Sequence, residues 1–175
     1  LRKQAHSMAV ELTGEDPSNE HQLLLAKSLQ RLGHSHKRMK EHRLALERYA
    51  KSLVAARESN ASNTPTRLEN SLLKSIGDMH SKLGDVANRD DYYAQSMRGR
   101  KQFHAANKGD TQGYRDIAVM HSSLARAAES PEEELEHYNQ YLEINLELFR
   151  TNPGDAATHR RDCGLGHYYM ATTLL

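Results

Sequence analysis

An internal repeat is the feature that most constrains what this chain can fold into, because a period of 20–50 residues indicates stacked copies of one supersecondary unit. In each copy a small residue follows Leu, Ile or Cys, and a histidine stands three positions after it. The small residues are Gly33, Gly77, Ala118 and Gly164, and the histidines are His36, His80, His121 and His167, so that successive copies lie 44, 41 and 46 residues apart.

A tyrosine motif recurs between these copies, at Tyr49, Tyr93 and Tyr138, with a degenerate copy over residues 4–8. Turns rich in Asn, Asp, Gly and Pro separate the copies, and apolar residues between the turns fall at helical spacing. Each unit is therefore predicted to be two antiparallel helices, of which helix A carries the small residue and helix B carries the tyrosine. Seven residues are expected to pack the helices together: Gly33, Tyr49, Gly77, Tyr93, Ala118, Tyr138 and Gly164.

The predicted fold class is all-α, a solenoid of stacked antiparallel helix pairs, because neither helix of a unit can bury its apolar face alone. About eight helices are expected, over residues 2–14, 19–38, 41–60, 65–83, 87–107, 111–127, 131–151 and 155–174. Ser130, Pro131 and Glu133 have the order of a capping box at the start of the helix over 131–151. We expect one array over residues 1–175, a fragment of a longer protein, made of units 1–17 (helix B only), 18–63, 64–109, 110–153 and 154–175 (helix A only).

The charge balance, the apolar runs and the cysteine count of the chain argue against several classes of function. The 24 basic and 23 acidic residues give a formal charge of +1, which argues against a dedicated nucleic-acid binder. No apolar run approaches the 18 residues of a membrane-spanning helix, so no membrane partner is predicted. Cys163 is the single cysteine and is expected to be a small buried side chain rather than part of a disulfide. One cysteine and no signal sequence favour the cytoplasm.

These motifs resemble the tetratricopeptide repeat family over nearly the whole chain. That family has a Leu-Gly pair in helix A, and an alanine and an aromatic residue in helix B. Leu32-Gly33, Ala45 and Tyr49 match this spacing, and Ile76-Gly77 and Tyr93 match it apart from Arg89 in place of the alanine. The third copy needs four extra loop residues, and histidine replaces the aromatic residue that usually follows the glycine.

The repeat is also about ten residues longer than the 34 residues usual in the family. It resembles the long-repeat variant of bacterial multidomain proteins, in which an Arg-Asp pair such as Arg161-Asp162 occurs early in helix A. The resemblance implies a right-handed superhelix that binds proteins and is often joined to signalling domains such as kinases. It implies neither catalysis nor a cofactor.

The resemblance also implies that helix A lines the concave groove, with particular positions on either side of the small residue facing inward. Those positions give a groove that is basic at one end and apolar-aromatic at the other. The residues expected to contact a partner are Lys27, Gln30, His34, Lys37, Arg38, Lys74, Asp78, Lys82, Arg115, Arg161, Tyr168 and Tyr169. We hypothesise that the groove takes a peptide segment with acidic residues followed by an apolar anchor. The alternative is ordinary solvated charge on a polar helix face.

Two other functions stay open beside a binding scaffold. The exposed ends of the array favour self-association, either head-to-tail or as a homodimer. The 11 histidines raise the hypothesis of a metal protein. However, the four recurring histidines stand one per unit, about 10 Å or more apart given the distances between packed helices. Ligands of one metal must lie much closer together, so no metal site is predicted and the histidines are expected to pack between helices.

Overall fold

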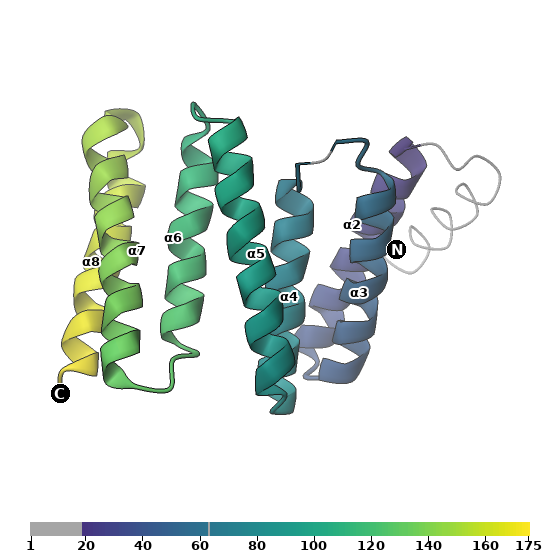
Figure 1. The fold of residues 1–175 in the computed structure, drawn as a ribbon, viewed down its shortest axis with the longest axis horizontal. Helices are drawn as coiled ribbons and strands as arrows, with labels where there is room; N and C mark the ends of the chain where they lie inside the picture. Colours follow the sequence, from purple (N-terminus) through teal and green to yellow (C-terminus); the bar gives the residue numbers. More distant parts are fainter. Residues whose placement is uncertain (1–18, 63) are drawn as a thin grey trace. The chain divides into compact units, whose positions relative to one another are not determined.

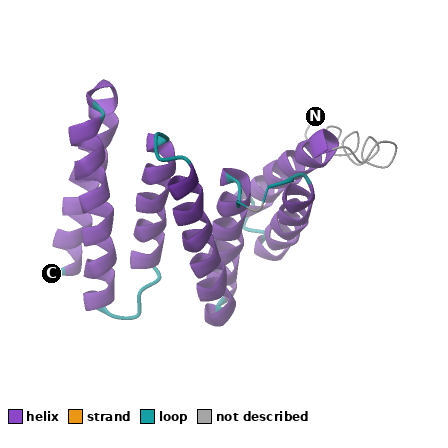
Figure 2. Ribbon diagram, turned by 45° about the horizontal axis from the view of Figure 1, so that its top comes forward, coloured by secondary structure: helices purple, strands orange, loops and turns teal. Residues whose placement is uncertain are grey.

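The computed structural model describes residues 19–62 and 64–175, and all regular structure over these residues is helical (Figures 1 and 2). Seven α-helices lie there: α2 (Asn19–Arg38), α3 (His42–Glu58), α4 (Arg67–Leu83), α5 (Val86–Ala106), α6 (Thr111–Ala125), α7 (Pro131–Thr151) and α8 (Ala156–Thr173). The short 3-10 helix η1 (Pro153–Asp155) leads into α8. The all-α helical-repeat prediction is confirmed, and each helix begins and ends within two residues of its expected bounds. The helix predicted over 2–14, and with it unit 1–17, lies outside the described residues.

The chain divides into two compact units, residues 1–99 and 100–175, with the boundary inside α5. In unit 1, α2 packs against α3 and α3 packs against α4. In unit 2, α6, α7 and α8 run side by side in that order (Figure 1). The boundary falls within the predicted unit 64–109. The single array and its right-handed superhelix stay predictions.

Helix starts are fixed by side chains that satisfy free backbone N–H groups. The Thr66 hydroxyl accepts the N–H of Glu69 at 3.2 Å, and the Glu69 carboxylate accepts the N–H of Thr66 at 3.2 Å, which completes a capping box at α4. At α7 the predicted box forms in part. Ser130 accepts the N–H of Glu133 at 3.2 Å, but the Glu133 carboxylate accepts from the N–H of Glu129.

Two glycines let helices A and B of unit 1 approach closely. A Cβ added at Gly33 would lie 2.5 Å from the Tyr49 ring, and one added at Gly77 would lie 2.5 Å from the Tyr93 ring. Both rings are buried, so each tyrosine fills the space that its glycine leaves empty. A side chain on either glycine would force the helices apart.

A buried hydrogen bond repeats beside each tyrosine. Ser52 on α3 donates to the carbonyl of Ala26 at 2.6 Å, and Ser96 on α5 donates to the carbonyl of Asn70 at 2.8 Å. Each serine stands three residues after its tyrosine, and each carbonyl belongs to the residue seven before the glycine. The two helix pairs of unit 1 therefore share one register.

The two pairs differ at one buried contact. Where the first pair has Ala26 and Ala55, the second has Asn70 and Gly99 at the equivalent positions, 44 residues later. Asn70 is 1% exposed, and its side-chain nitrogen and oxygen have no hydrogen-bond partner among the residues described. A Cβ at Gly99 would lie 1.9 Å from Asn70 Oδ1. Gly99 is therefore required by the larger side chain that faces it.

The recurring histidines of unit 1 contact the turn between helices A and B, and His80 also stacks on Tyr92 of α5, with ring centroids 5.4 Å apart. The His80 carbonyl accepts the N–H of Asp85 at 3.0 Å, while His80 Nδ1 lies 3.0 Å from Asp85 Oδ2. His36 makes the same two contacts with Glu41. The residue just before each acid has left-handed backbone: φ is 78° at Gly84 and 60° at Lys40.

Unit 2 follows the pattern less regularly. Ala118 and Tyr138 are buried as expected. Gly164 is exposed, and a Cβ there would meet nothing within 4 Å. The predicted unit 154–175 has no helix B for Gly164 to face, so its packing role stays a prediction. Gly166 is the buried glycine of α8, and a Cβ there would lie 3.3 Å from Leu142 and Tyr141 of α7. Residues two apart on a helix point in nearly opposite directions, so Gly164 faces away from α7.

Candidate functional site

In unit 1, two of the predicted groove lysines converge on one carboxylate. Lys37 Nζ on α2 lies 3.0 Å from Asp78 Oδ2 on α4. Lys74 Nζ, one turn before Asp78 on the same helix, lies 3.1 Å from both carboxylate oxygens. The Tyr93 hydroxyl, held over Gly77, donates to Asp78 Oδ1 at 2.8 Å. We call these four residues the lysine cluster, and it joins successive A helices.

The two lysines keep Asp78 ionised. Burial alone would raise the pKa of this carboxyl group, but the charges of Lys74 and Lys37 and the hydrogen bonds from Lys37 and Tyr93 hold it below its ordinary value. Asp78 therefore carries a full negative charge at neutral pH. The cluster has two positive charges and one negative, so a net charge of +1 remains at a fixed place.

His34 stands where Asp78 stands in the next copy, directly after the glycine. Its Nδ1 lies 2.9 Å from the Tyr49 hydroxyl, which matches the contact of Tyr93 with Asp78. Burial and the charge of Asp78 raise the pKa of Tyr49 to about 12, so the hydroxyl stays protonated. The side chain directly after the small residue therefore contacts the tyrosine hydroxyl in both helix pairs.

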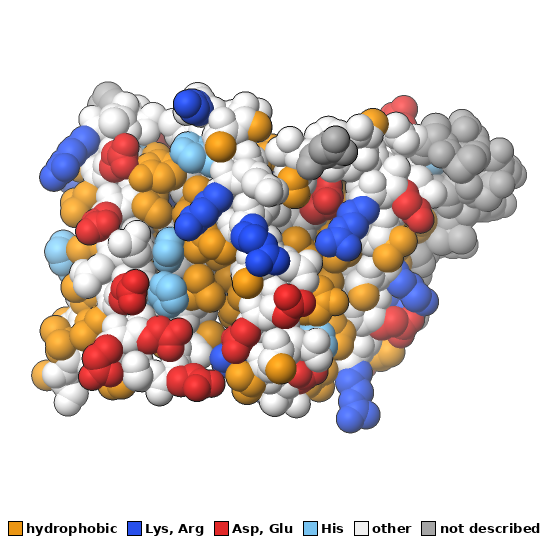
Figure 3. All heavy atoms as spheres, viewed as in Figure 1, with side chains coloured by type: hydrophobic (Ala, Val, Ile, Leu, Met, Phe, Trp, Pro, Cys, Tyr) orange, Lys and Arg blue, Asp and Glu red, His pale blue; other side chains and the backbone are white. Residues whose placement is uncertain are grey.

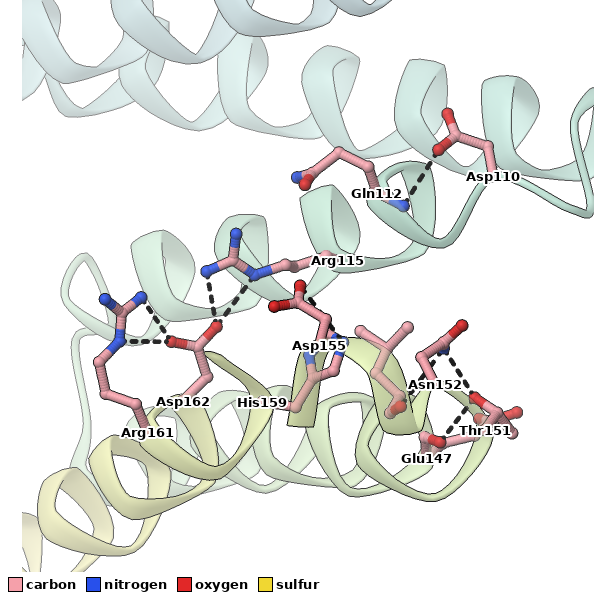
Figure 4. A network of polar contacts seen from close by, with 11 residues as sticks. Asp110, Gln112, Arg115, Glu147, Thr151, Asn152, Asp155, His159, Arg161 and Asp162 are labelled. Carbon is pink, nitrogen blue, oxygen red and sulfur yellow. Dashed lines mark hydrogen bonds and ion pairs between the residues drawn. The ribbon is translucent and has the colours of Figure 1, made fainter. Parts of the chain in front are cut away.

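Unit 2 repeats the arrangement with arginines (Figure 4). Arg115 on α6 donates from Nε and from a terminal nitrogen to Asp162 Oδ2 on α8, at 3.0 and 2.7 Å. Arg161 donates to Asp162 Oδ1 at 3.2 and 3.0 Å. The Asp162 side chain is 7% exposed, whereas that of Arg161 is 67% exposed. We call these three residues the arginine cluster, and it again has two cations on one carboxylate.

An aromatic surface lies on α8 of the same unit. Tyr169 stacks on Tyr138 with ring centroids 5.0 Å apart and meets Tyr168 edge-on at 5.8 Å. Tyr168 is exposed over 62% of its surface. Two of the predicted aromatic contact residues thus form one patch, although Tyr169 also packs the helices.

The other predicted contact residues lie at the surface or are half-buried. Lys27, Arg38 and Lys82 are exposed, and Gln30 is half-buried. Sequence reasoning missed the acceptor role of Asp162, which satisfies both arginines. The pair Arg161-Asp162 was visible in the sequence, but Arg115 is 47 residues from Asp162 and nothing local indicated the contact. Lys74 and Asp78, by contrast, are four apart, the spacing at which helix residues meet.

Histidine in unit 2 has a different environment from the histidines of unit 1. The residue five after His121 is Arg126, where the other copies have Glu41 and Asp85. His121 Nδ1 lies 3.4 Å from Nδ1 of His137 instead. Burial, with the nearby His137 and Lys101, lowers the pKa of His121 to about 4. Over residues 19–62 and 64–175, no three His, Cys, Asp or Glu side chains lie together as a metal-binding group.

Comparisons with known proteins bear on the fold. No family model matches the chain, and no curated protein matches it in sequence. The crystal structure of BtubC (BKLC) from P. vanneervenii is similar with a TM-score of 0.60 and 13% sequence identity, and the match covers 99% of this chain and 83% of that one. Among the described residues, no helix is both long and apolar enough to cross a membrane.

Proposed function

We propose that this chain is a non-catalytic, cytoplasmic scaffold of the long-repeat tetratricopeptide kind, which binds an acidic segment of a partner protein along its A helices. The observation that carries the proposal is the same in both units. Two cationic side chains from successive A helices share one carboxylate, at Asp78 and at Asp162. Each cluster therefore contains one more cation than carboxylate.

The shared carboxylate also positions the cations. A lysine ammonium has three N–H donors and an arginine has five, so contact with one aspartate leaves donors on Lys37, Arg115 and Arg161 for a second carboxylate. Because the side chains are already held, an incoming acid costs less ordering entropy than it would with mobile surface cations. Charge-assisted hydrogen bonds of this kind are stronger than neutral ones.

The aromatic patch supports the apolar part of the proposal. Leu165 and Tyr168 are 37% and 62% exposed on α8, which also carries Asp162 and Arg161 of the arginine cluster. A partner segment with an acid followed by an apolar side chain would then meet both features within one unit. Exposed aromatic residues beside arginine are typical of sites that bind protein segments.

A labelled peptide with four glutamates followed by leucine and phenylalanine is the probe that tests this proposal, by fluorescence anisotropy. The informative variant is Lys37→Gln/Arg161→Gln. It removes one cation from each cluster and leaves Lys74 and Arg115 to hold the aspartates. We expect binding to weaken about tenfold or more, because each charge-assisted hydrogen bond contributes about 1.5–3 kcal/mol.

The matched control is Lys51→Gln/Arg57→Gln, which makes the same change of charge on exposed positions of α3. It should bind the probe like the wild type, and circular dichroism should show equal helix content in all three proteins. Equal weakening in both variants would mean that the peptide responds to net charge alone. An absence of binding to the wild type would exclude an acidic segment as the partner.

Self-association is the second candidate, and α8 is the element that favours it. A Cβ at Gly164 would meet nothing within 4 Å, Leu165 and Tyr168 are exposed on this helix, and Leu174 is exposed at its C-cap. Light scattering at 5 and 500 µM would detect a dimer, and Leu165→Ser/Tyr168→Ser should then reduce the mass at the higher concentration. A constant monomer mass would exclude this function.

A further inference from the structure

His121 and His137 form a pair of imidazoles that face each other from α6 and α7. Their Nδ1 atoms lie 3.4 Å apart, their ring centroids are 5.5 Å apart, and the ring planes are inclined by 47°. Both residues are half-buried, so solvent reaches the pair. Figure 3 shows histidine side chains at the surface in the region of α6 and α7.

A comparison with the turns of unit 1 shows why the His121 and His137 rings lie against each other. In unit 1, Nδ1 of the recurring histidine is occupied by an acid five residues later. Arg126 takes that position after His121, and an arginine has no acceptor to offer. His121 is thereby released from the turn, and its Nδ1 lies against a ring from the next helix.

We propose that His121 and His137 together bind one divalent late transition-metal ion, such as Zn²⁺ or Cu²⁺, through their two Nδ1 atoms. Imidazole nitrogen is a good ligand for both metals. With metal–nitrogen bonds of about 2.0–2.1 Å and tetrahedral angles, two such nitrogens are about 3.3 Å apart and the ring centroids about 5.2 Å apart. The observed separations of 3.4 and 5.5 Å are within a few tenths of an ångström of this geometry.

The two imidazole rings can both offer a lone pair to a metal ion by a change of tautomer. A hydrogen bond between two neutral rings needs one Nδ1–H donor and one Nδ1 acceptor. When a metal ion enters, the donor ring loses its Nδ1 proton and takes up one at Nε2, so both lone pairs become available with no net proton release.

The site is weak and exchangeable rather than structural. No third His, Cys, Asp or Glu joins the pair in the described part of the chain, so water completes the coordination. The Lys101 charge, which lowers the pKa of His121, also opposes a dication. Bound metal would cross-link α6 and α7 and stabilise their packing.

Titration of the apo protein with Zn²⁺ at pH 7 by calorimetry tests the proposal. We expect saturable binding of one ion per chain, which is lost in His121→Gln and equally in His137→Gln. The control variants His36→Gln and His80→Gln remove the equivalent histidines of unit 1 and should retain binding. No saturable binding to the wild type, or unchanged binding in the His121 and His137 variants, would overturn it.

Two further measurements separate a direct role from a loss of folding. Circular dichroism should show all four variants folded, and Zn²⁺ should raise the Tm of the wild type but not that of His121→Gln or His137→Gln. Lys101→Gln should bind Zn²⁺ more tightly, because it removes a repelling charge. Weaker or unchanged binding in that variant would contradict the location of the site. None of these results depends on the acidic probe peptide, so this inference and the proposed scaffold function fail or succeed separately.

Discussion

At the scale of single residues, the contact between Asn70 and Gly99 shows how a repeat is adjusted without losing its register. The equivalent residues of the preceding pair, Ala26 and Ala55, are two small side chains that are both buried. In the second pair, Asn70 has a larger side chain than Ala26, and the residue that faces it is Gly99, which has no Cβ. The substitution also leaves a buried amide without a described hydrogen-bond partner, which costs about 1–3 kcal/mol.

We predict that Gly99→Ala destabilises the protein by about 1–3 kcal/mol, because its Cβ would overlap Asn70 Oδ1. The double variant Asn70→Ala/Gly99→Ala recreates the alanine pair of the first repeat. It should recover the whole loss and exceed the wild type by about 1 kcal/mol. Urea unfolding measures all three stabilities. A double variant no more stable than Gly99→Ala would contradict the explanation.

The two left-handed turn residues should respond in opposite directions to substitution. Lys40 has φ 60° at the position where the next copy has Gly84. We expect Lys40→Gly to stabilise the protein by about 0.5–1 kcal/mol and Gly84→Ala to destabilise it by about 1 kcal/mol. No atom lies within 4 Å of a Cβ at Gly84, so the effect there is one of backbone conformation alone. Urea midpoints at constant m-value measure both.

At the scale of elements, the sequence was sufficient to place the helices but not to assign their side-chain partners. Helical spacing and turn residues located all seven described helices within two residues. The histidine repeat was detected, and His80 packs on Tyr92 of the facing helix as expected, but the contacts with the turn were missed. His36 and His80 also contact Glu41 and Asp85, in the turn five residues later. A helix C-terminus that folds back changes which residues a side chain can reach, and spacing alone does not show this.

The packing of α6 on α7 should give the protein a specific pH dependence. His121 has an unfolded pKa near 6.5 and a folded pKa of about 4, so below pH 6.5 the unfolded chain binds a proton that the folded chain refuses. Stability should therefore fall as the pH drops from 6.5 to 4 and level off below. Since the ring is partly exposed, we expect about 1–2 kcal/mol in total.

Urea unfolding between pH 7 and 4 in the presence of EDTA measures this contribution without metal. His121→Gln should reduce the acid-induced loss by that amount. An identical pH profile in the wild type and His121→Gln would show that His121 is not held neutral by its surroundings.

At the scale of the whole molecule, the near balance of 24 basic and 23 acidic residues means that charge acts through local groups. The sequence predicted basic positions on the A helices, and the structure brings together Lys37 with Lys74, and Arg115 with Arg161. The sequence did not predict that two cations share one carboxylate in each unit. The ion pairs Lys37–Asp78 and Arg115–Asp162 join residues 41 and 47 apart, and such contacts depend on how the helices pack.

Salt should therefore weaken partner binding in a way that depends on the clusters. We expect the wild type to bind the acidic probe about tenfold more weakly at 0.5 M than at 0.05 M NaCl, because the Debye length shrinks to a few ångströms. Lys37→Gln/Arg161→Gln should show a clearly smaller salt dependence in the same anisotropy assay. Equal salt dependence in the two proteins would place the binding charges elsewhere.

The Asn70–Gly99 contact also distinguishes the second helix pair from the first. Repeated sequences carry a hazard, since similar helices can pair with the wrong neighbour during folding or exchange between chains. If α4 paired with α3 in the register of the first repeat, Asn70 would face the Cβ of Ala55 instead of a glycine. That overlap disfavours the slipped pairing, whereas Gly99 on α5 leaves room for the Asn70 side chain. The Asn70–Gly99 contact thus lowers stability but favours the pairing of α4 with α5 over the slipped pairing. An array built from identical copies of the first repeat would have no such preference.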